Sequence, residues 1–513
     1  MNASRSAPEL ARTREVGVTG GPPRAGLTRQ LGLLGLTATG ICSMVGAAIN
    51  VIPFMIHRTV PGIGPHVLTA FLIAAVPAVL AAMAYATLAS AMPRAGGSYV
   101  YASRGLNPYL GFVASFSQWF GLSIAIGVVA YVLIFFLRDI AIALGWVGLA
   151  QAISSRALHP VVSLAILWTF VAVNLRGLKL YERTLVPLMF LMFALGAVVI
   201  VVGLLYNQGD FAEAVLRRDG RAVGAAPPAP VSLGTLLTAS AILFSSFIGF
   251  DSIAQAGGEA KRPERMLPLA ITLAIVVVTT YYLSFVAAVY HTVPWWFVAQ
   301  EALVRDVTAP GLLGYVLAPG WTVLIVAGAA TALTNDLPAM LLAVSRLMFA
   351  WAEDGIFPRA VASVHPTRHT PHIAIVLSGL MASLGILGSH FAGTFFLGVD
   401  ILVTAMLVNF LIMCVTVLTL SSRNAELARA IRVVRQRGSQ IILGSLGIVF
   451  LGLFLAVHTF RDLTQPANAW YFRATWLWLG VMLVGTVIYA AERRALRQRG
   501  VDVDARFRTL PPE

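Results

Sequence analysis

The sequence predicts an all-α integral membrane protein with twelve transmembrane helices, and three observations lead to this fold class. The first is composition: 58% of the 513 residues are hydrophobic and only 11% are charged, whereas about 25% of residues are charged in soluble globular proteins. The second is that several apolar stretches exceed the roughly 20 residues that a helix needs to cross a bilayer. The third is that positive charges are distributed unequally between alternate connecting segments.

The apolar stretches divide the chain into twelve predicted spans. In chain order these are 31–56, 66–92, 108–137, 158–175, 184–206, 233–258, 268–291, 320–350, 371–390, 397–420, 439–459 and 474–491. Residues 1–30 are polar and contain five arginines, a composition typical of a disordered tail. Residues 492–513 are expected to form a second polar tail. Both tails are predicted to lie in the cytoplasm.

The Lys and Arg residues support this number of spans. With the N-terminus inside, the inner segments carry 27 of the 36 basic residues and the outer segments carry 9. Such an excess is typical of cytoplasmic loops. The formal charge of +14 therefore reflects topology, and no nucleic-acid partner is expected. The two cysteines, Cys42 and Cys414, lie inside predicted spans, so no disulfide framework is implied.

Spans 1 and 6 contain residues that interrupt a helix. Span 1 holds Gly40, Gly46 and Pro53 near its centre, and span 6 holds Gly249 followed by Asp251. Membrane helices normally run unbroken because lipid offers no partners for free backbone groups. A matching pair of interrupted segments in two halves of a chain indicates the binding site of a transporter. The alternative is that the small residues only allow close helix packing.

Two long outer loops are predicted to differ in structure. The loop 207–232 is polar and rich in Ala and Pro, and we expect it to be irregular. The loop 292–320 contains Trp295, Trp296 and Tyr315, which suggests short helices at the membrane interface. These helices could form an outer lid, or their aromatic residues could simply belong to an interfacial belt.

Four motifs resemble those of the amino acid–polyamine–organocation (APC) family. They occur in order at Gly40–Pro53, Ser90–Tyr101, Phe247–Pro268 and Ser345–Pro366, and the resemblance covers about residues 31–420. It implies a LeuT-like fold with two inverted five-helix repeats, at about 31–206 and 233–420. Two extra helices would follow within 439–491, completing a twelve-helix transporter domain at 31–491. The broken spans 1 and 6 would then be symmetry mates.

The helix breaks are the predicted substrate site. A restarting half-helix exposes free N–H groups that attract a carboxylate, and the preceding half exposes carbonyls that attract an ammonium. By resemblance, the substrate-binding residues are Cys42, Ser43, Met44, Val45, Gly46, Ala47, Ala48, Ser245, Phe247, Ile248, Gly249 and Phe250. The chain departs from the family pattern at Ala48, where a glycine is usual, and at Asn50, where an aromatic residue is usual. An amine without the carboxylate therefore remains an alternative substrate.

Two acidic residues within spans are candidates for gating or coupling, because charges inside a membrane are costly and usually functional. Asp251 follows the span 6 break and could be a protonatable gate or could cap the second half-helix. Asp336 lies in span 8 beside Thr334 and Asn335, where it could bind a proton or a cation or serve a structural role. Some proton-coupled relatives place a lysine in span 5, but Met192 stands at about that position here.

These features predict a secondary active transporter that moves an amino acid across the cytoplasmic membrane by alternating access. Its energy would come from a proton gradient or from exchange. A polyamine or other organic-amine carrier is the alternative, and a non-transporting sensor or a membrane enzyme is less favoured. The expected partners are a small-molecule substrate, a coupling proton or cation, and membrane lipid. No cofactor is expected, and His365, His369 and His372 in an inner loop are not expected to bind a metal.

Overall fold

The computed structural model describes residues 27–464 and 472–511, so most of the predicted N-terminal tail lies outside the described residues. Within this part of the chain, twelve helices are long and apolar enough to cross a membrane. In order they are α1–α2 (Leu33–Met44 and Ala47–Thr59), α3 (Val67–Ala91), α5 (Pro108–Ala143), α7 (Leu158–Leu175), α8 (Leu178–Leu205), α10–α11 (Leu233–Leu243 and Asp251–Gln255), α12 (Pro263–Thr292), α15 (Pro319–Glu353), α16 (His372–Ala392), α17 (Phe396–Arg423), α19 (Arg437–Thr464) and α20 (Ala474–Gln498).

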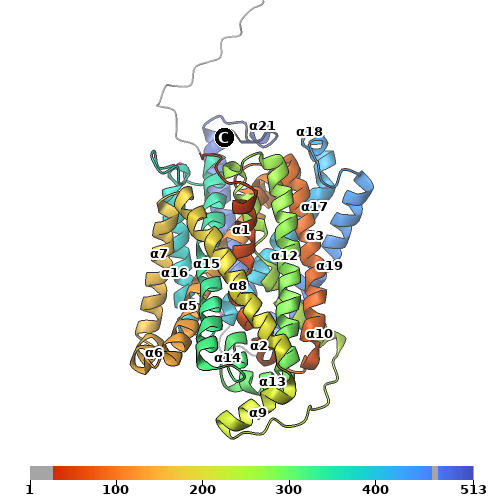
Figure 1. Cartoon of the computed structure of the whole chain (residues 1–513). Coiled ribbons are helices and arrows are strands. Elements are labelled where there is room, and N and C mark those ends of the chain that lie inside the picture. Colours follow the sequence, from red (N-terminus) through yellow and green to blue (C-terminus); the bar gives the residue numbers. More distant parts are fainter. Residues whose placement is uncertain (1–26, 465–471, 512–513) are drawn as a thin grey trace, which may run out of the picture.

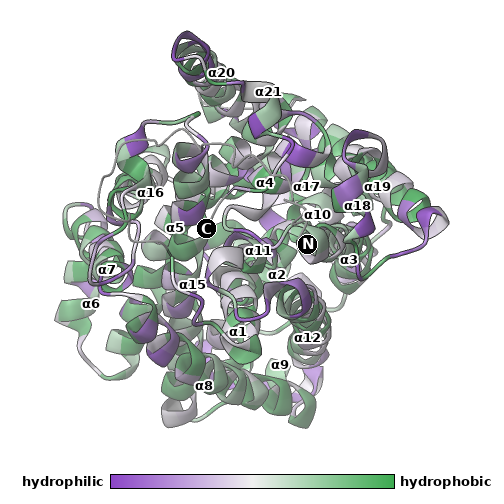
Figure 2. Ribbon diagram, turned by 90° about the horizontal axis from the view of Figure 1, so that it is seen from above, coloured by the Kyte–Doolittle hydropathy of each residue, from purple (hydrophilic) through white to green (hydrophobic). Residues whose placement is uncertain are grey.

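The two interrupted spans lie at the centre of the bundle. Viewed along the membrane normal, α1, α2 and α11 are surrounded by α3, α5, α8, α12, α15 and α17 (Figure 2). The helices α7, α19 and α20 lie at the periphery and expose much of their apolar surface. The predicted fold class is therefore confirmed: an all-α LeuT-like bundle of twelve spans in which spans 1 and 6 are broken.

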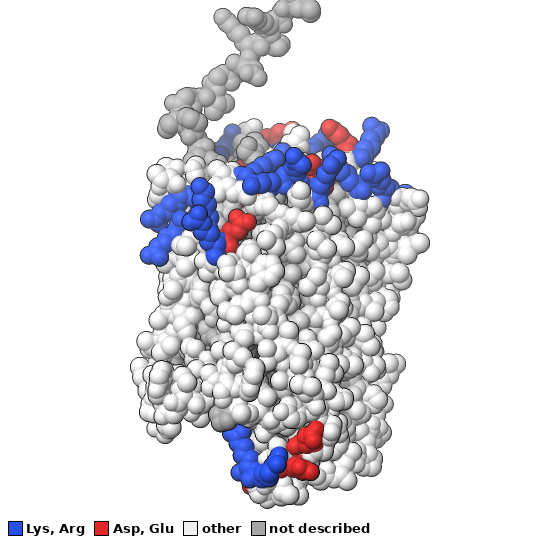
Figure 3. Space-filling model, in the orientation of Figure 1, with Lys and Arg blue, Asp and Glu red and all other residues white. Residues whose placement is uncertain are grey.

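The outer surface matches a bilayer environment. Large apolar side chains such as Leu205, Val276 and Leu483 are more than half exposed, and charged residues gather at the two ends of the bundle (Figure 3). Most of the visible Lys and Arg residues lie on the end that carries the described chain termini, which we call the termini face. The other end is called the opposite face.

Short helices cover the opposite face. The loop expected to be irregular contains α9 (Gln208–Asp219), so that prediction is wrong for its first half. The cause is a capping box, in which the Asn207 side chain accepts from the backbone of Asp210 and the Asp210 carboxylate accepts from the backbone of Asn207. Such reciprocal bonds satisfy the free donors of a helix start. The short helices predicted for the second loop are confirmed as α13 (Trp295–Val304) and α14 (Ala309–Leu313).

The remaining connections carry helices α4 (Gly97–Gly105), α6 (Val147–Ser154), α18 (Ala425–Arg429) and α21 (Val503–Arg506), with 3-10 turns η1 (Gly64–His66), η2 (Phe244–Phe247), η3 (Gly257–Glu259) and η4 (Arg359–Ala362). The most informative of these is α21, because residues 501–511 turn back across the termini face. We call this stretch the C-terminal segment. The backbone oxygen of Thr509 accepts a hydrogen bond from Arg104 at 3.2 Å, and that of Arg508 accepts one from Asn424 at 3.0 Å.

Phe507 anchors the C-terminal segment. Its side chain is buried, and the Arg104 guanidinium lies 4.9 Å from the ring centroid. Arg104 also forms a bidentate ion pair with Asp354 at 2.6 and 2.9 Å. Asp354 further accepts a 2.7 Å bond from Tyr99, and burial, together with the Asp354 charge, raises the pKa of Tyr99 so that its hydroxyl stays protonated.

We expect the substitution Phe507→Ala to release the C-terminal segment. Removing a buried aromatic side chain costs about 3–5 kcal/mol in a well-packed core, and the loss here should be toward the low end because the segment can detach. Limited digestion with trypsin, followed by mass spectrometry, should show faster cleavage after Arg506 and Arg508. The control Phe460→Ala removes a ring that is 71% exposed and should leave the cleavage rate unchanged. Equal rates in all three proteins would contradict this role.

Candidate binding site at two broken helices

The first break separates α1 from α2. Helix α1 ends at Met44, and Gly46, with φ −153° and ψ −122°, is neither helical nor extended before α2 begins at Ala47. The last carbonyls of α1 and the first N–H groups of α2 therefore have no partner within their own helices. The Met44 carbonyl at the end of α1 and the Gly46 carbonyl just before α2 each bond to a side chain. Met44 accepts from Tyr282 at 2.5 Å, and Gly46 accepts from Asn50 at 3.1 Å.

The second break separates α10 from α11. Between the 3-10 turn η2 and α11, Gly249 has φ 141°, a conformation that side chains rarely adopt. The two breaks touch at this point, since a methyl group added to Gly249 would lie 2.3 Å from the backbone oxygen of Ser43. The sequence prediction of two breaks, and of their positions in spans 1 and 6, is confirmed.

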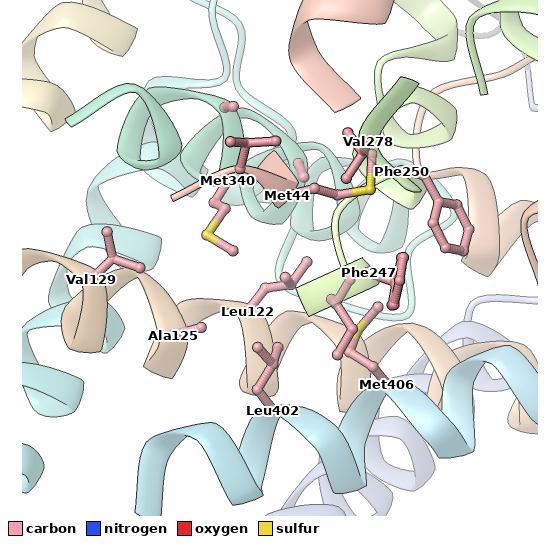
Figure 4. Packing of buried hydrophobic residues seen from close by; sticks show 14 of the residues in the cluster. Met44, Leu122, Ala125, Val129, Phe247, Phe250, Val278, Met340, Leu402 and Met406 are labelled. Carbon is pink, nitrogen blue, oxygen red and sulfur yellow. The ribbon is translucent and has the colours of Figure 1, made fainter. Parts of the chain in front are cut away.

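A small cavity lies beside the two breaks. Its volume is about 50 Å³, and its wall is formed by Ser43, Met44, Ile52, Ala125, Val128, Val129, Ser245, Ile248, Asp336, Met340, Gly398, Val399 and Leu402. Met340, Ala125 and Leu402 come from three different helices and lie around a common space (Figure 4). Most of the wall is apolar, which suits a ligand with an apolar body.

Three polar groups on this wall lack a partner in the described structure. They are the hydroxyls of Ser43 and Ser245 and the Oδ1 atom of Asp336, and all three side chains are buried. Asp336 lies against the first break: a methyl group added to Gly46 would lie 1.8 Å from Asp336 Oδ2. Because buried polar groups are almost always hydrogen-bonded, three orphans on one cavity indicate a ligand position.

The structure separates the predicted substrate residues into two groups. Ser43, Met44, Ser245 and Ile248 line the cavity, whereas Cys42, Val45, Gly46, Phe247, Gly249 and Phe250 are not part of its wall. The Cys42 sulfur accepts a 2.8 Å bond from Asn335, and the Phe250 ring stacks on Phe410 at 5.0 Å. Phe247 packs against Tyr282, with ring centroids 5.7 Å apart. The side chains of Ala47 and Ala48 lie outside the described residues.

The gating candidates have different surroundings. Thr334 bonds back to the carbonyl of Ala330 at 2.7 Å, so its hydroxyl is already used within its own helix. Asp251 is the first residue of α11, and its carboxylate accepts from the backbone of Gly249 at 3.1 Å and from the side chain of Gln118. Gln118 belongs to α5, so this bond joins span 6 to span 3.

A polar network extends from Asp251 through Gln118. The Oε1 atom of Gln118 accepts from Ser98 at 2.5 Å, from Gln255 at 3.2 Å and from Asn409 at 3.2 Å. Asn409 in turn accepts from the Tyr85 hydroxyl. The sequence identified Asp251 but none of these partners, because they come from helices distant in the chain.

Ion pairs close the bundle on both sides of the cavity. On the termini face, Arg346 of α15 pairs with Glu259 of η3 at 2.5 Å, and both side chains are 2% exposed. On the opposite face, Arg58 of α2 pairs with Asp306 at 2.8 Å. The Arg58 pair therefore joins broken span 1 to the segment after α13. The Arg346 pair joins the turn that follows broken span 6 to α15. Among the described residues, no group of three or more His, Cys, Asp or Glu side chains could hold a metal ion.

Apart from Asp336, sequence reasoning did not find the wall contributed by α5, α15 and α17. Ala125, Val128, Met340, Val399 and Leu402 are ordinary apolar residues in apolar spans, and no motif distinguishes them. A weak signal was available at Gly398, a small residue in the first turn of α17, but small residues in membrane helices usually serve packing.

Twelve apolar spans around a cavity at two broken helices define a membrane transport protein. Comparison with known proteins gives the particular family: the sequence model of the amino acid permease family matches residues 31–487. The chain belongs to this family, and the resemblance to APC-family permeases is confirmed.

Relatives with curated descriptions agree with this assignment. A branched-chain amino acid permease of Bacillus subtilis is 27% identical, with 92% of this chain and 95% of the relative aligned. A methylthioribose transporter of the same organism is 26% identical, over 79% of this chain and 84% of the relative. Cationic amino acid transporter 4 of Mus musculus is 27% identical over 70% of this chain and 55% of the relative.

Proposed function

We propose that the protein is a secondary active transporter that carries an amino acid across the cytoplasmic membrane by alternating access. The observation that carries the proposal is the cavity at the two helix breaks, where the hydroxyls of Ser43 and Ser245 and the Asp336 carboxylate face an otherwise apolar wall without partners. The excess of Lys and Arg on the termini face supports a cytoplasmic location for both termini. The repeats at about 31–206 and 233–420 form part of this proposal.

An amino acid with an apolar side chain suits the site best. The free N–H groups at the start of α2 favour a carboxylate, and the walls from α5 and α17 favour an apolar side chain. The branched-chain specificity in the name of one relative agrees with this reading. A polyamine carrier is the second candidate, but a diamine has two cationic ends and Asp336 is the only charged residue on the described wall.

For the energy source, we propose proton coupling or exchange. The bond from Gln118 to Asp251 crosses from α5 to α11, and such a bond would weaken on protonation of the carboxylate. Protonation of Asp251 could therefore release the bundle of spans 1, 2, 6 and 7 from the remaining scaffold. Its position at the start of α11 also supports the alternative cap role, since its carboxylate accepts the Gly249 N–H.

Transport by purified protein in proteoliposomes tests this function. Radiolabelled amino acids should be taken up and should exchange with internal unlabelled substrate, and excess putrescine should not compete. Inhibition by the diamine with no amino-acid uptake would support the polyamine carrier instead. Specific binding without counterflow would indicate a sensor, and chemical conversion of the substrate would indicate an enzyme.

Proton coupling predicts a pH effect that depends on Asp251. Uptake by the wild type should be faster with the more acidic external buffer, because the inward proton gradient is then larger. Asp251→Asn should abolish that difference, since an amide cannot carry the proton. The measurement is initial uptake at two external pH values with the internal pH fixed. If both proteins ignore external pH, the protein works by exchange or uses another ion.

A further inference from the structure

Two carbonyls at the first helix break already accept hydrogen bonds from side chains. The carbonyl of Met44, the last residue of α1, accepts from the Tyr282 hydroxyl, and the Gly46 carbonyl accepts from the Asn50 side-chain amide. Asn50 lies four residues after Gly46 in α2, so this second bond is made within one helix turn. Helix-break carbonyls are therefore less available to an ammonium than their free position at a helix end suggests.

Asp336 offers a stronger acceptor at the same place. Its side chain is 3% exposed, Oδ1 has no hydrogen-bond partner, and no described Lys, Arg or His lies within ion-pair distance of it. It lines the cavity and reaches the break so closely that a methyl group added at position 46 would lie 1.8 Å from Oδ2. An ionised carboxylate inside a membrane protein is costly unless it meets a cation.

We propose that Asp336 is the counter-ion of the substrate's ammonium group, with the Ser43 and Ser245 hydroxyls as further acceptors. This inference rests on the proposed transport function and specifies its substrate class: a compound with one ammonium group and an apolar body. An ammonium has three N–H donors, and the cavity wall carries three polar groups without partners. The rest of this wall is apolar and holds no second carboxylate, so it would reject a second ammonium group.

The test compares L-leucine with its 2-hydroxy analogue, which keeps the carboxylate and side chain but replaces the ammonium by a hydroxyl. Binding to the purified protein is measured for the wild type and for Asp336→Asn. The wild type should prefer leucine. In the variant the affinity for leucine should fall about 30-fold or more, as expected for truncating one partner of a buried charge pair, while the affinity for the analogue should change less than about 3-fold.

Two further variants make the result specific. Gly46→Ala keeps the carboxylate but places a methyl group where Asp336 Oδ2 now lies, so it should reduce the preference for leucine in the same direction. Asp400→Asn removes a carboxylate of α17 that pairs with Arg461 at 3.0 Å and does not line the cavity. This control should keep the wild-type preference. Size-exclusion chromatography and thermal unfolding verify that each variant is folded.

The outcomes separate the inference from the transport proposal. If Asp336→Asn binds leucine as the wild type does, Asp336 is not the ammonium site, and loss of accumulation in that variant would assign it to the coupling ion instead. If Asp336→Asn misfolds, an unchanged preference in Gly46→Ala still overturns the inference. If the wild type binds and transports neither leucine nor any other amino acid or amine, the transport proposal fails and this inference falls with it.

Discussion

Replacing Glu259 with alanine is expected to destabilise the protein by about 3–5 kcal/mol, the usual cost of leaving one member of a buried ion pair without its partner. Glu259 accepts two hydrogen bonds from Arg346, at 2.5 and 3.1 Å, and neither side chain reaches solvent. The variant would keep the Arg346 charge buried with only the Ser345 hydroxyl at 2.9 Å to bond it. Thermal unfolding of the purified protein in detergent measures the effect.

A surface pair provides the matched control. Glu264 lies 3.8 Å from Arg432, with 32% and 48% of the two side chains exposed, and exposed pairs contribute about 0–1 kcal/mol. Glu264→Ala should therefore change the unfolding temperature little. The double variant Glu259→Leu with Arg346→Met removes both buried charges, so it should be more stable than Glu259→Ala. If the double variant is no more stable than Glu259→Ala, the unpaired Arg346 charge is not the cause of the destabilisation.

The second large effect is expected for Gly249→Ala. The added methyl group would lie 2.3 Å from the Ser43 oxygen and 2.5 Å from its carbonyl carbon, and φ at this position is 141°. Both contacts are to backbone, which cannot rotate away as a side chain could. We expect the free energy of unfolding to fall by about 1–3 kcal/mol from backbone strain alone. Transport should fall by an order of magnitude or more, because the added methyl group forces the two breaks apart.

The control for this variant is Gly388→Ala. Gly388 lies inside α16, and an added methyl group there meets no atom within 4 Å. Alanine in a helix is favoured over glycine by roughly 0.5–1 kcal/mol, so this variant should unfold at the same or a higher temperature. Uptake in proteoliposomes and thermal unfolding are measured for both. Normal uptake by Gly249→Ala would show that the two breaks do not need to touch at this point.

The sequence alone determined the number of spans and the positions of both breaks. Span length and apolar composition are properties of consecutive residues, so twelve spans could be counted without any tertiary contact. The breaks are local as well, because each is marked by a glycine within its span, and Gly249 has a positive φ that other residues resist. The four motifs, compared with those of known permeases, were sufficient to identify the family.

Only the tertiary structure decided which residues meet at the cavity. Helix α5 is apolar around its whole circumference and largely buried, so hydrophobic periodicity could not show that Ala125 and Val128 face the site. The partners of Asp251 and the closeness of Asp336 to Gly46 depend on long-range packing between spans. From the sequence, the C-terminal segment was predicted to be a polar tail, yet Phe507 is buried against Arg104. The sequence could not show this contact, because an isolated aromatic residue gains a partner only when the termini face has assembled.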